Sequence, residues 1–327
     1  MKKIRFLPCL AIAALAVPAV LSTQAHAKDY PVKPVKIVVP FAAGGGADQL
    51  ARLIALHWQT TLGTPVIVDN KTGGNTVIAA EYVARAEPDG YTLLLTTGST
   101  MAVTPSLYAR LPYDAQKSFT PVGQVSQVPF FLTVPASGGI TSVADLIAKA
   151  KAKPGAISYA SAGSGTTGHL AFELLGRTAG FEAIHVPYKS YAAAIPDLVT
   201  ARVSALIADI PVIGSQLKSG QLRALATTGK NRSPFLPQVP TLAESGVAGF
   251  DMSVWFGVFA PAGTPPQVVA RLNAELQNFL NSNTGKEKFN AIGHNPAPST
   301  PEALSTLVKT EAEKWGKVIR DAGIKPD

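Results

Sequence analysis

Two short glycine-rich segments hold the residues of this chain that could bind an anion. The first is A-A-G-G-G-A-D at positions 42–48, after the apolar run Val35–Val39. The second is G-S-G-T-T-G at positions 163–168, after Ile157–Ala160. In each case a predicted strand leads through a loop to the start of a predicted helix, where backbone N–H groups and the helix dipole favour negative charge. The pattern therefore predicts two anion-binding corners.

Both corners lack the residues that a nucleotide needs. The second has the G-x-G-x-x-G spacing of dinucleotide sites, but the next predicted strand ends V-P-Y-K, without the acidic residue that contacts a ribose. No Gly-Lys-Ser/Thr follows the first corner, as a nucleotide phosphate loop requires. A carboxylate suits the second corner better, because its loop N–H groups lie beside the hydroxyls of Ser161, Ser164, Thr166 and Thr167. The alternative is that the glycines serve only a tight turn.

Two further positions have both a binding and a structural interpretation. Thr97, Gly98 and Ser99 follow the predicted strand Tyr91–Thr96, and open α/β sheets bind ligands at the carboxyl ends of such strands. Helix capping by Ser99 is the alternative. Asp48 either complements the dipole of its helix as a first-turn acid or accepts a hydrogen bond from a ligand or from a loop N–H group.

The sequence lacks the common patterns of catalytic and metal sites. It contains no H-x-H, H-E-x-x-H or G-x-S-x-G, and Cys9 is the single cysteine. We therefore predict no catalytic residue, no metal and no cofactor. A triad of Ser164, His169 and Asp209 assembled by the fold is the alternative, and His169 is expected in the first turn of a helix near the cleft.

The N-terminus reads as a cleavable export signal. Lys2, Lys3 and Arg5 precede an apolar stretch, and Ala25-His26-Ala27 matches the small-residue pattern of a cleavage site before Lys28. We therefore predict a signal peptide over 1–27 and a periplasmic location.

The formal net charge of the chain is +8, but the basic residues are scattered, which argues against nucleic-acid binding. The remaining length, about 300 residues, favours two domains.

Apolar strand-like runs alternate with helical patterns along the chain. This alternation indicates an α/β fold with mainly parallel sheets covered by helices on both faces. The predicted strands are Val35–Val39, Val66–Val68, Tyr91–Thr96, Ile157–Ala160, Ala183–Val186, Ala205–Ala208 and Leu222–Ala226. The predicted helices between them are Gln49–Thr61, Val77–Ala86, Val143–Lys151, Thr167–Thr178 and Ala192–Thr200.

Two longer apolar runs, Thr120–Val134 and Met252–Ala260, are predicted to cross between the domains, because each ends in a proline-containing loop. They place one discontinuous domain at 28–130 and 255–327 and a second domain at 131–254. The amphipathic segments Gln267–Leu280 and Pro301–Ala322 are expected to pack back on the first domain.

Several motifs in the same order resemble one known family. They are V-K-I-V-V-P-F-A-A-G-G-G-A-D, E-P-D-G-Y-T-L-L-L-T-T, I-S-Y-A-S-A-G-S-G-T-T-G-H-L, H-V-P-Y-K and W-F-G-V-F-A-P-A-G-T-P. Together they resemble the Bug-type substrate-binding receptors of tripartite tricarboxylate transporters across essentially the whole mature chain. The resemblance implies a two-domain periplasmic binding protein of type II-like fold, hinged by two crossing strands.

The resemblance also implies a function without catalysis. The receptor would be a monomer that closes on a small carboxylate, mono- or dicarboxylate, and delivers it to the large and small permease subunits in the membrane. Combined with the two corners, it predicts ligand contacts at Phe41, Ala43, Gly44, Gly45, Ala47, Asp48, Thr97, Gly98, Ser99, Ser161, Ser164, Gly165, Thr166, Thr167, His169, Tyr188 and Asp209.

The chain departs from the family pattern at two places. Family members often have Asp-Asn where this chain has Asp209-Ile210, which removes a polar group. The family loop P-G-A-G-G is T-G-G-N-T here, at positions 72–76, which adds polar side chains. We expect an apolar Ile210 to suit a ligand with an apolar or aromatic body.

Two other classes of function remain open at this point. One is an exported serine-dependent hydrolase that uses Ser164 or Ser99. The other is a ligand-sensing subunit of a membrane signalling protein.

Overall fold

The computed structural model describes residues 30–108 and 110–322. The predicted signal peptide lies outside these described residues. The described residues from Pro31 onward form one compact unit, and it contains two five-stranded sheets. Among the described helices, none combines the length and the hydrophobicity needed to cross a membrane.

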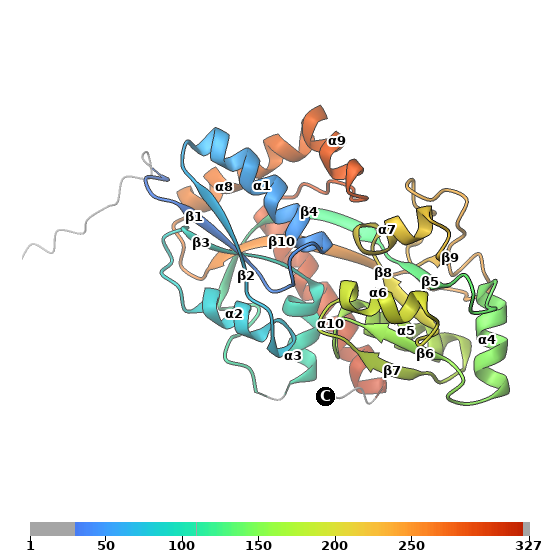
Figure 1. The fold of residues 1–327 in the computed structure, drawn as a ribbon. Coiled ribbons are helices and arrows are strands. Elements are labelled where there is room, and N and C mark those ends of the chain that lie inside the picture. The colour runs from blue at the N-terminus through green and yellow to red at the C-terminus, as the bar shows by residue number, and fades with distance from the viewer. Residues whose placement is uncertain (1–29, 109, 323–327) are drawn as a thin grey trace, which may run out of the picture. The chain divides into compact units, whose positions relative to one another are not determined.

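The first sheet has the strand order β2-β1-β3-β10-β4. Strands β2, β1 and β3 run parallel, whereas β10 is antiparallel to both of its neighbours. The bounds are β1 Val35–Val39, β2 Val66–Asn70, β3 Thr92–Thr97, β4 Phe119–Pro129 and β10 Ser253–Pro261. Figure 1 shows β4 and β10 side by side.

The second sheet repeats this arrangement with the order β7-β6-β8-β5-β9. Strands β7, β6 and β8 are parallel, and β5 is antiparallel to both β8 and β9. The bounds are β5 Phe131–Pro135, β6 Ser158–Ser161, β7 Ile184–Pro187, β8 Ala205–Ala208 and β9 Leu222–Thr227.

Helices follow most of the parallel strands. After strands of the first sheet come α1 (Gly46–Leu62), η2 (Gly74–Thr76) with α2 (Val77–Ala84), and η3 (Ser99–Val103) with α3 (Thr104–Leu107). In the second half lie α4 (Val143–Ala152), α5 (Thr167–Ala179), α6 (Tyr191–Val199) and α7 (Ile210–Lys218). The C-terminal helices are α8 (Pro266–Asn281), α9 (Asn283–Ala291) and α10 (Pro301–Ala322). Both α8 and α10 contact β4, so they pack back on the first sheet as predicted.

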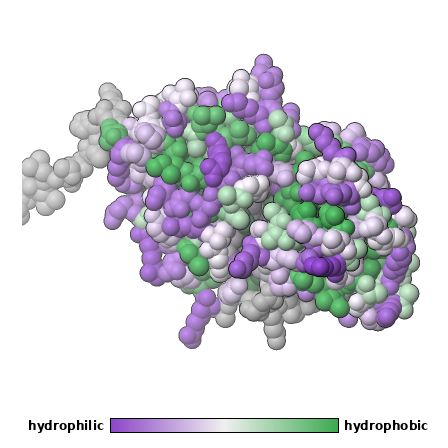
Figure 2. Space-filling model, viewed as in Figure 1, coloured by the Kyte–Doolittle hydropathy of each residue, from purple (hydrophilic) through white to green (hydrophobic). Residues whose placement is uncertain are grey.

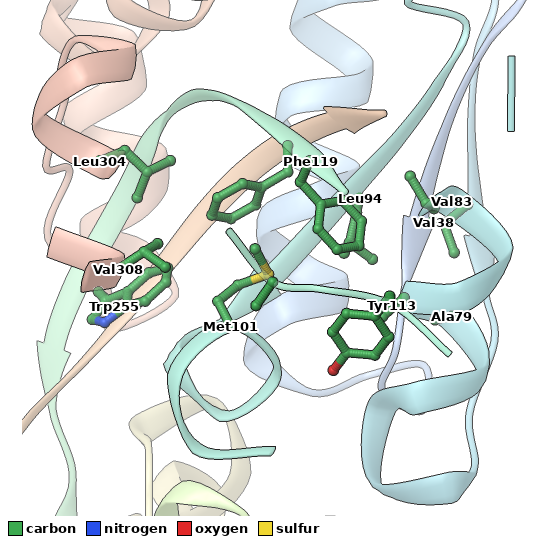
Figure 3. Packing of buried hydrophobic residues seen from close by; sticks show 13 residues of the cluster. Val38, Ala79, Val83, Leu94, Met101, Tyr113, Phe119, Trp255, Leu304 and Val308 are labelled. Carbon is green, nitrogen blue, oxygen red and sulfur yellow. The ribbon is translucent and has the colours of Figure 1, made fainter. Parts of the chain in front are cut away.

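The largest aromatic side chains of β10 anchor the core of the first sheet. Trp255 and Phe259 are 2% and 1% exposed and pack with Phe119 at the start of β4. Figure 3 shows Trp255 beside Leu304 and Val308 of α10. Helix α10 therefore covers the first sheet by packing against β10, the strand that pairs with β3.

On the surface, Figure 2 shows hydrophobic residues interspersed among hydrophilic ones on the face in view.

The chain passes between the sheets at two neighbouring points. Phe130 separates β4 from β5, and its backbone N–H donates to Thr228 Oγ1 at 2.9 Å instead of extending either strand. Met252 lies just before β10, and its N–H donates to the carbonyl oxygen of Thr228 at 2.8 Å. Thr228 thus ties the two crossings together.

The predicted α/β fold with two mainly parallel sheets flanked by helices is confirmed. Strands β1 and β8 and helix α10 have the predicted bounds. The single predicted strand Thr120–Val134 is wrong, because the break at Phe130 divides it between the sheets. Helices α7 and α9 were not predicted. The break coincides with the predicted boundary at 130 and 131, but the domain boundaries stay a prediction.

The core of the first sheet should depend strongly on Phe259. We expect Phe259→Ala to lower the free energy of unfolding by about 3–5 kcal/mol, because it leaves a cavity between β10 and Phe119. Urea denaturation of the two proteins measures this difference. Ile67→Ala in β2 is the control, because Ile67 is 52% exposed and its loss should cost much less. Equal losses in the two variants would contradict this packing.

Candidate functional site

A cavity of about 610 Å³ lies between the two sheets. Its walls come mainly from the loops after β1, β2 and β3 of the first sheet and after β6, β7 and β8 of the second. The parallel strands end at these loops, which is where open α/β sheets bind ligands. The lining residues include Pro40–Ala43, Gly45–Ala47, Thr72–Thr76, Thr97, Ser99, Ser164, Thr166, Thr167, Lys189–Ala192, Asp209 and Phe256.

The first predicted corner forms one wall of the cavity. Gly45 is the N-cap of α1 in an extended conformation, and no side chain caps the helix. The N–H groups of the first turn have no intrahelical partner, so Gly46 and Ala47 direct free donors to this end of the helix. Gly44 has φ +88°, a left-handed conformation that glycine adopts without steric cost.

Asp48 braces this loop and does not line the cavity. Its Oδ2 accepts from the Gly44 N–H at 2.9 Å and from Arg52 Nε at 2.9 Å. Burial by itself would raise the pKa of Asp48, but the hydrogen bonds from Arg52 and Gly44 outweigh it, so the pKa lies below its ordinary value. Two of the interpretations open from sequence hold together, because Asp48 lies in the first turn of α1 and also accepts the hydrogen bond from a loop N–H group.

The second predicted corner faces the same cavity. Thr166 is the N-cap of α5, and its side chain does not cap the helix. Its hydroxyl donates instead to the carbonyl oxygen of Gly163 at 2.7 Å. The Tyr191 hydroxyl accepts the Gly168 N–H at 2.8 Å, so the Thr167 N–H is the first-turn donor of α5 that remains for an anion.

The two halves of the cavity meet at a hydroxyl pair. Ser99 Oγ and Thr167 Oγ1 are 3.0 Å apart, although 68 residues separate them in the chain. Ser99 begins η3 after β3, and Thr167 begins α5 after β6. This hydrogen bond joins loops that follow strands of different sheets.

Asp209, the N-cap of α7, makes a second approach across the cavity. Its Oδ2 lies 3.7 Å from Nε2 of the buried His294, and an added Cβ on Gly46 would collide with the Asp209 carboxylate. Ser126 Oγ donates to the carbonyl oxygen of Asn295 at 2.8 Å and lies 3.2 Å from His294 Nδ1. Nδ1–H of His294 is therefore the donor to Ser126, and Nε2 faces Asp209 without a hydrogen-bond partner among the described residues.

Ten of the seventeen predicted contacts line the cavity. They are Phe41, Ala43, Gly45, Ala47, Thr97, Ser99, Ser164, Thr166, Thr167 and Asp209. The other seven do not line the cavity. They are Gly44, Asp48, Gly98, Ser161, Gly165, His169 and Tyr188.

Local hydrogen bonds explain the position of several residues behind the lining. His169 Nδ1 accepts the Gly165 N–H at 2.8 Å, and the Tyr188 hydroxyl donates to Asp197 Oδ2 at 2.7 Å. Ser161 is fully buried and lies 2.6 Å from His185 Nε2. These side chains support the loops from the protein side.

Other lining residues were not predicted as contacts. They include Asn75, Thr76, Tyr108, Lys189, Tyr191 and Val212. The Tyr191 hydroxyl accepts the Gly168 N–H at 2.8 Å, and burial raises its pKa to about 12, so it is a neutral group. Its position after the H-V-P-Y-K motif was the available signal in the sequence. Lys189 and Asp209 are the only residues with ordinarily charged side chains among the described lining residues.

Residues 50–324 match the receptor of the tripartite tricarboxylate transporter family. The chain belongs to this receptor family. The receptor is 37% identical over 306 residues to protein BugT of Bordetella pertussis, covering 93% of this chain and 94% of BugT. The resemblance to Bug-type receptors noted from the motifs is thereby confirmed.

Two solved structures are also similar to this receptor. R. palustris Rpa4515 with adipate is 40% identical, has a TM-score of 0.88, and is matched over 91% of this chain and 100% of its own. MatC (Rpa3494) from Rhodopseudomonas palustris with bound malate is 31% identical, has a TM-score of 0.83, and is matched over 89% and 100%.

The brace at Asp48 should make the stability of the receptor dependent on pH. We expect Asp48→Asn to lower the free energy of unfolding by about 1–3 kcal/mol at neutral pH, because two hydrogen bonds to a carboxylate are weakened. The folded-state pKa is depressed, so this contribution is present above the ordinary value of 3.8 and is lost as the pH falls through the lower folded-state value.

Urea denaturation at a series of pH values from neutral to strongly acidic measures the gap between wild type and Asp48→Asn. The control is Asp251→Asn, because Asp251 is exposed and should show little effect at any pH. A gap for Asp48→Asn that stays constant down to low pH would contradict the assigned role of the charge.

Proposed function

We propose that this receptor binds a small mono- or dicarboxylate in the cavity, in the periplasm, and delivers it to the membrane permease subunits of a tripartite tricarboxylate transporter. The observation that carries the proposal is the convergence of two helix N-termini, those of α1 and α5, on one cavity, where neither N-cap residue caps its helix. Such ends bind carboxylates through backbone N–H groups and the helix dipole.

The composition and size of the cavity support a small organic anion. Hydroxyl groups from Thr97, Ser99, Ser164 and Thr167 add donors beside the helix ends. Lys189 is the only described lining residue that is ordinarily cationic, and it is exposed, so the site does not depend on an arginine fork. A cavity of about 610 Å³ lies within the range that accommodates small ligands.

The two similar structures agree with this class of ligand. Rpa4515 was solved with adipate and MatC with bound malate, which are both dicarboxylates. For the present receptor we propose only the shared class, a small carboxylate.

The contacts across the cavity support a closing mechanism. A carboxylate held by α1 and α5 would touch loops of both sheets, next to the Ser99–Thr167 hydroxyl pair. Only the closed form brings both helix ends to one ligand, so the ligand would stabilise that form. The neighbouring crossings at Phe130 and Met252, tied through Thr228, are the proposed hinge.

We favour a receptor without enzymatic activity over a serine hydrolase. Two serine–histidine pairs are close, Ser161 with His185 and Ser126 with His294. None of these four residues lines the cavity, and both serines are fully buried. The predicted partner of Ser164, His169, accepts the Gly165 N–H through Nδ1. A monomeric receptor that binds two permease subunits is consistent with the family. A role as the ligand-sensing subunit of a membrane signalling protein is the second proposed function.

Carboxylate binding should depend on the α5 corner. A thermal-shift screen with aliphatic and aromatic mono- and dicarboxylates should find a stabilising ligand, worth about 2.7 kcal/mol at a hundredfold its Kd. Calorimetry should then show Thr167→Ala weakening that ligand up to about tenfold, because a hydroxyl donor is removed. The matched control is Thr178→Ala in the last turn of α5, whose hydroxyl bonds within the helix to Leu174 at 2.7 Å.

Two outcomes would contradict the proposal. If no carboxylate in the screen stabilises the protein, carboxylate binding is wrong. If the selected ligand binds wild type and Thr167→Ala equally well, the α5 corner is not part of the site.

A further inference from the structure

Three buried polar atoms of η2 have no hydrogen-bond partner among the described residues. They are Oδ1 and Nδ2 of Asn75 and Oγ1 of Thr76. Thr76 is 3% exposed, and both residues line the cavity. Buried polar side chains are normally hydrogen-bonded in folded proteins, so a group of three unpaired atoms at a cavity wall calls for a partner from outside the chain.

The backbone of η2 is strained at the same two residues. Asn75 has φ 48° and ψ 54°, and Thr76 has φ 75° and ψ −10°. Positive φ is a genuine outlier for a β-branched residue such as threonine. Backbone strain of this kind persists where surrounding structure enforces it, and it is concentrated at ligand sites.

The Thr76 hydroxyl does not make the hydrogen bond that is usual at its position in the helix. Thr76 is the N-cap of α2, a position where a threonine hydroxyl commonly accepts a hydrogen bond from the first turn, but here its side chain makes no cap. The carbonyl oxygen of Asn75 lies 3.5 Å from Thr104 Oγ1. An added Cβ on Gly165 would come within 2.9 Å of Asn75 Nδ2. The amide therefore lies beside the loop that leads to α5.

We propose that Asn75 and Thr76 bind a second polar group of the ligand, and that this group is a hydroxyl on the carboxylate's carbon chain. The inference rests on the proposed function, in which helix ends bind the carboxylate. It deepens that function by naming hydroxycarboxylates as the preferred class. The two side chains determine specificity, and their unpaired polar atoms make no hydrogen bond within the described chain.

A hydroxyl matches the unpaired atoms better than a plain carboxylate does. A carboxylate accepts hydrogen bonds only, so it could pair with Asn75 Nδ2 and the Thr76 hydroxyl but would leave Asn75 Oδ1 unsatisfied. A hydroxyl donates to Oδ1 and accepts from either donor. The conclusion does not depend on the orientation of the Asn75 amide, because both of its polar atoms lack partners.

The test compares ligands that differ by one hydroxyl. Calorimetry on the mature protein measures succinate against malate, and glutarate against 2-hydroxyglutarate. We expect wild type to bind the hydroxylated member of at least one pair about tenfold more tightly, which is the upper range for one neutral hydrogen bond.

Two conservative variants separate ligand binding from a structural role. Asn75→Gly removes the amide and accepts positive φ without strain, and Thr76→Val removes the hydroxyl while keeping the side-chain shape. Each should reduce the hydroxyl preference severalfold and leave the affinity for the plain dicarboxylate within about twofold. Asn281→Ala is the control, because Asn281 is exposed at the end of α8 and should leave the preference unchanged.

The outcomes distinguish this inference from the proposed function. Equal affinity of wild type for both members of each pair overturns the inference and leaves carboxylate binding intact. An equal loss of affinity for both members in the variants also overturns it, since it indicates a structural role. Binding of none of the four acids, and of no other carboxylate, overturns the proposed function together with this inference.

Discussion

The site depends on one geometric constraint, that the parallel strands of both sheets end at a single cavity. Because a helix follows most of these strands, helix N-termini gather there, with their dipoles and unpaired N–H groups directed to the same space. The N-cap residues of α1 and α5 do not cap their helices, and in α5 the Tyr191 hydroxyl takes one first-turn N–H, that of Gly168. The fold thus concentrates positive potential without charged side chains, and an anion is the natural complement.

Internal carboxylates are arranged around this concentration of helix ends. Asp48 lies in the first turn of α1 and stiffens its loop by accepting the Gly44 N–H, and its carboxylate also accepts a hydrogen bond from Arg52. Asp209 comes from the other sheet and approaches both Gly46 and His294. Asp48 therefore stiffens the loop of its own anion corner. Asp209 instead reaches across the cavity from the loop after β8, where a ligand would be enclosed.

Sequence reasoning predicted the features that depend on neighbouring residues. The run Val35–Val39 and the glycines after it specify a strand, a loop and a helix start by local chemistry alone, and the structure has them there. Sequence reasoning did not predict the contacts between segments that are distant in the chain. The pairing of Ser126 with His294 spans 168 residues, and the division of Thr120–Val134 follows from the bond between Phe130 and Thr228. The composition of η2 was visible as a departure from the family pattern, but its unpaired atoms follow only from packing.

The central claim is that backbone N–H groups of α1 and α5, and not a basic side chain, hold the carboxylate. A crystal structure of the protein with succinate, or with the acid that the screen selects, tests it most directly. The account predicts carboxylate oxygens about 3 Å from backbone nitrogens at Gly46, Ala47 or Thr167. A carboxylate held by the Lys189 ammonium group, away from both helix ends, would contradict it.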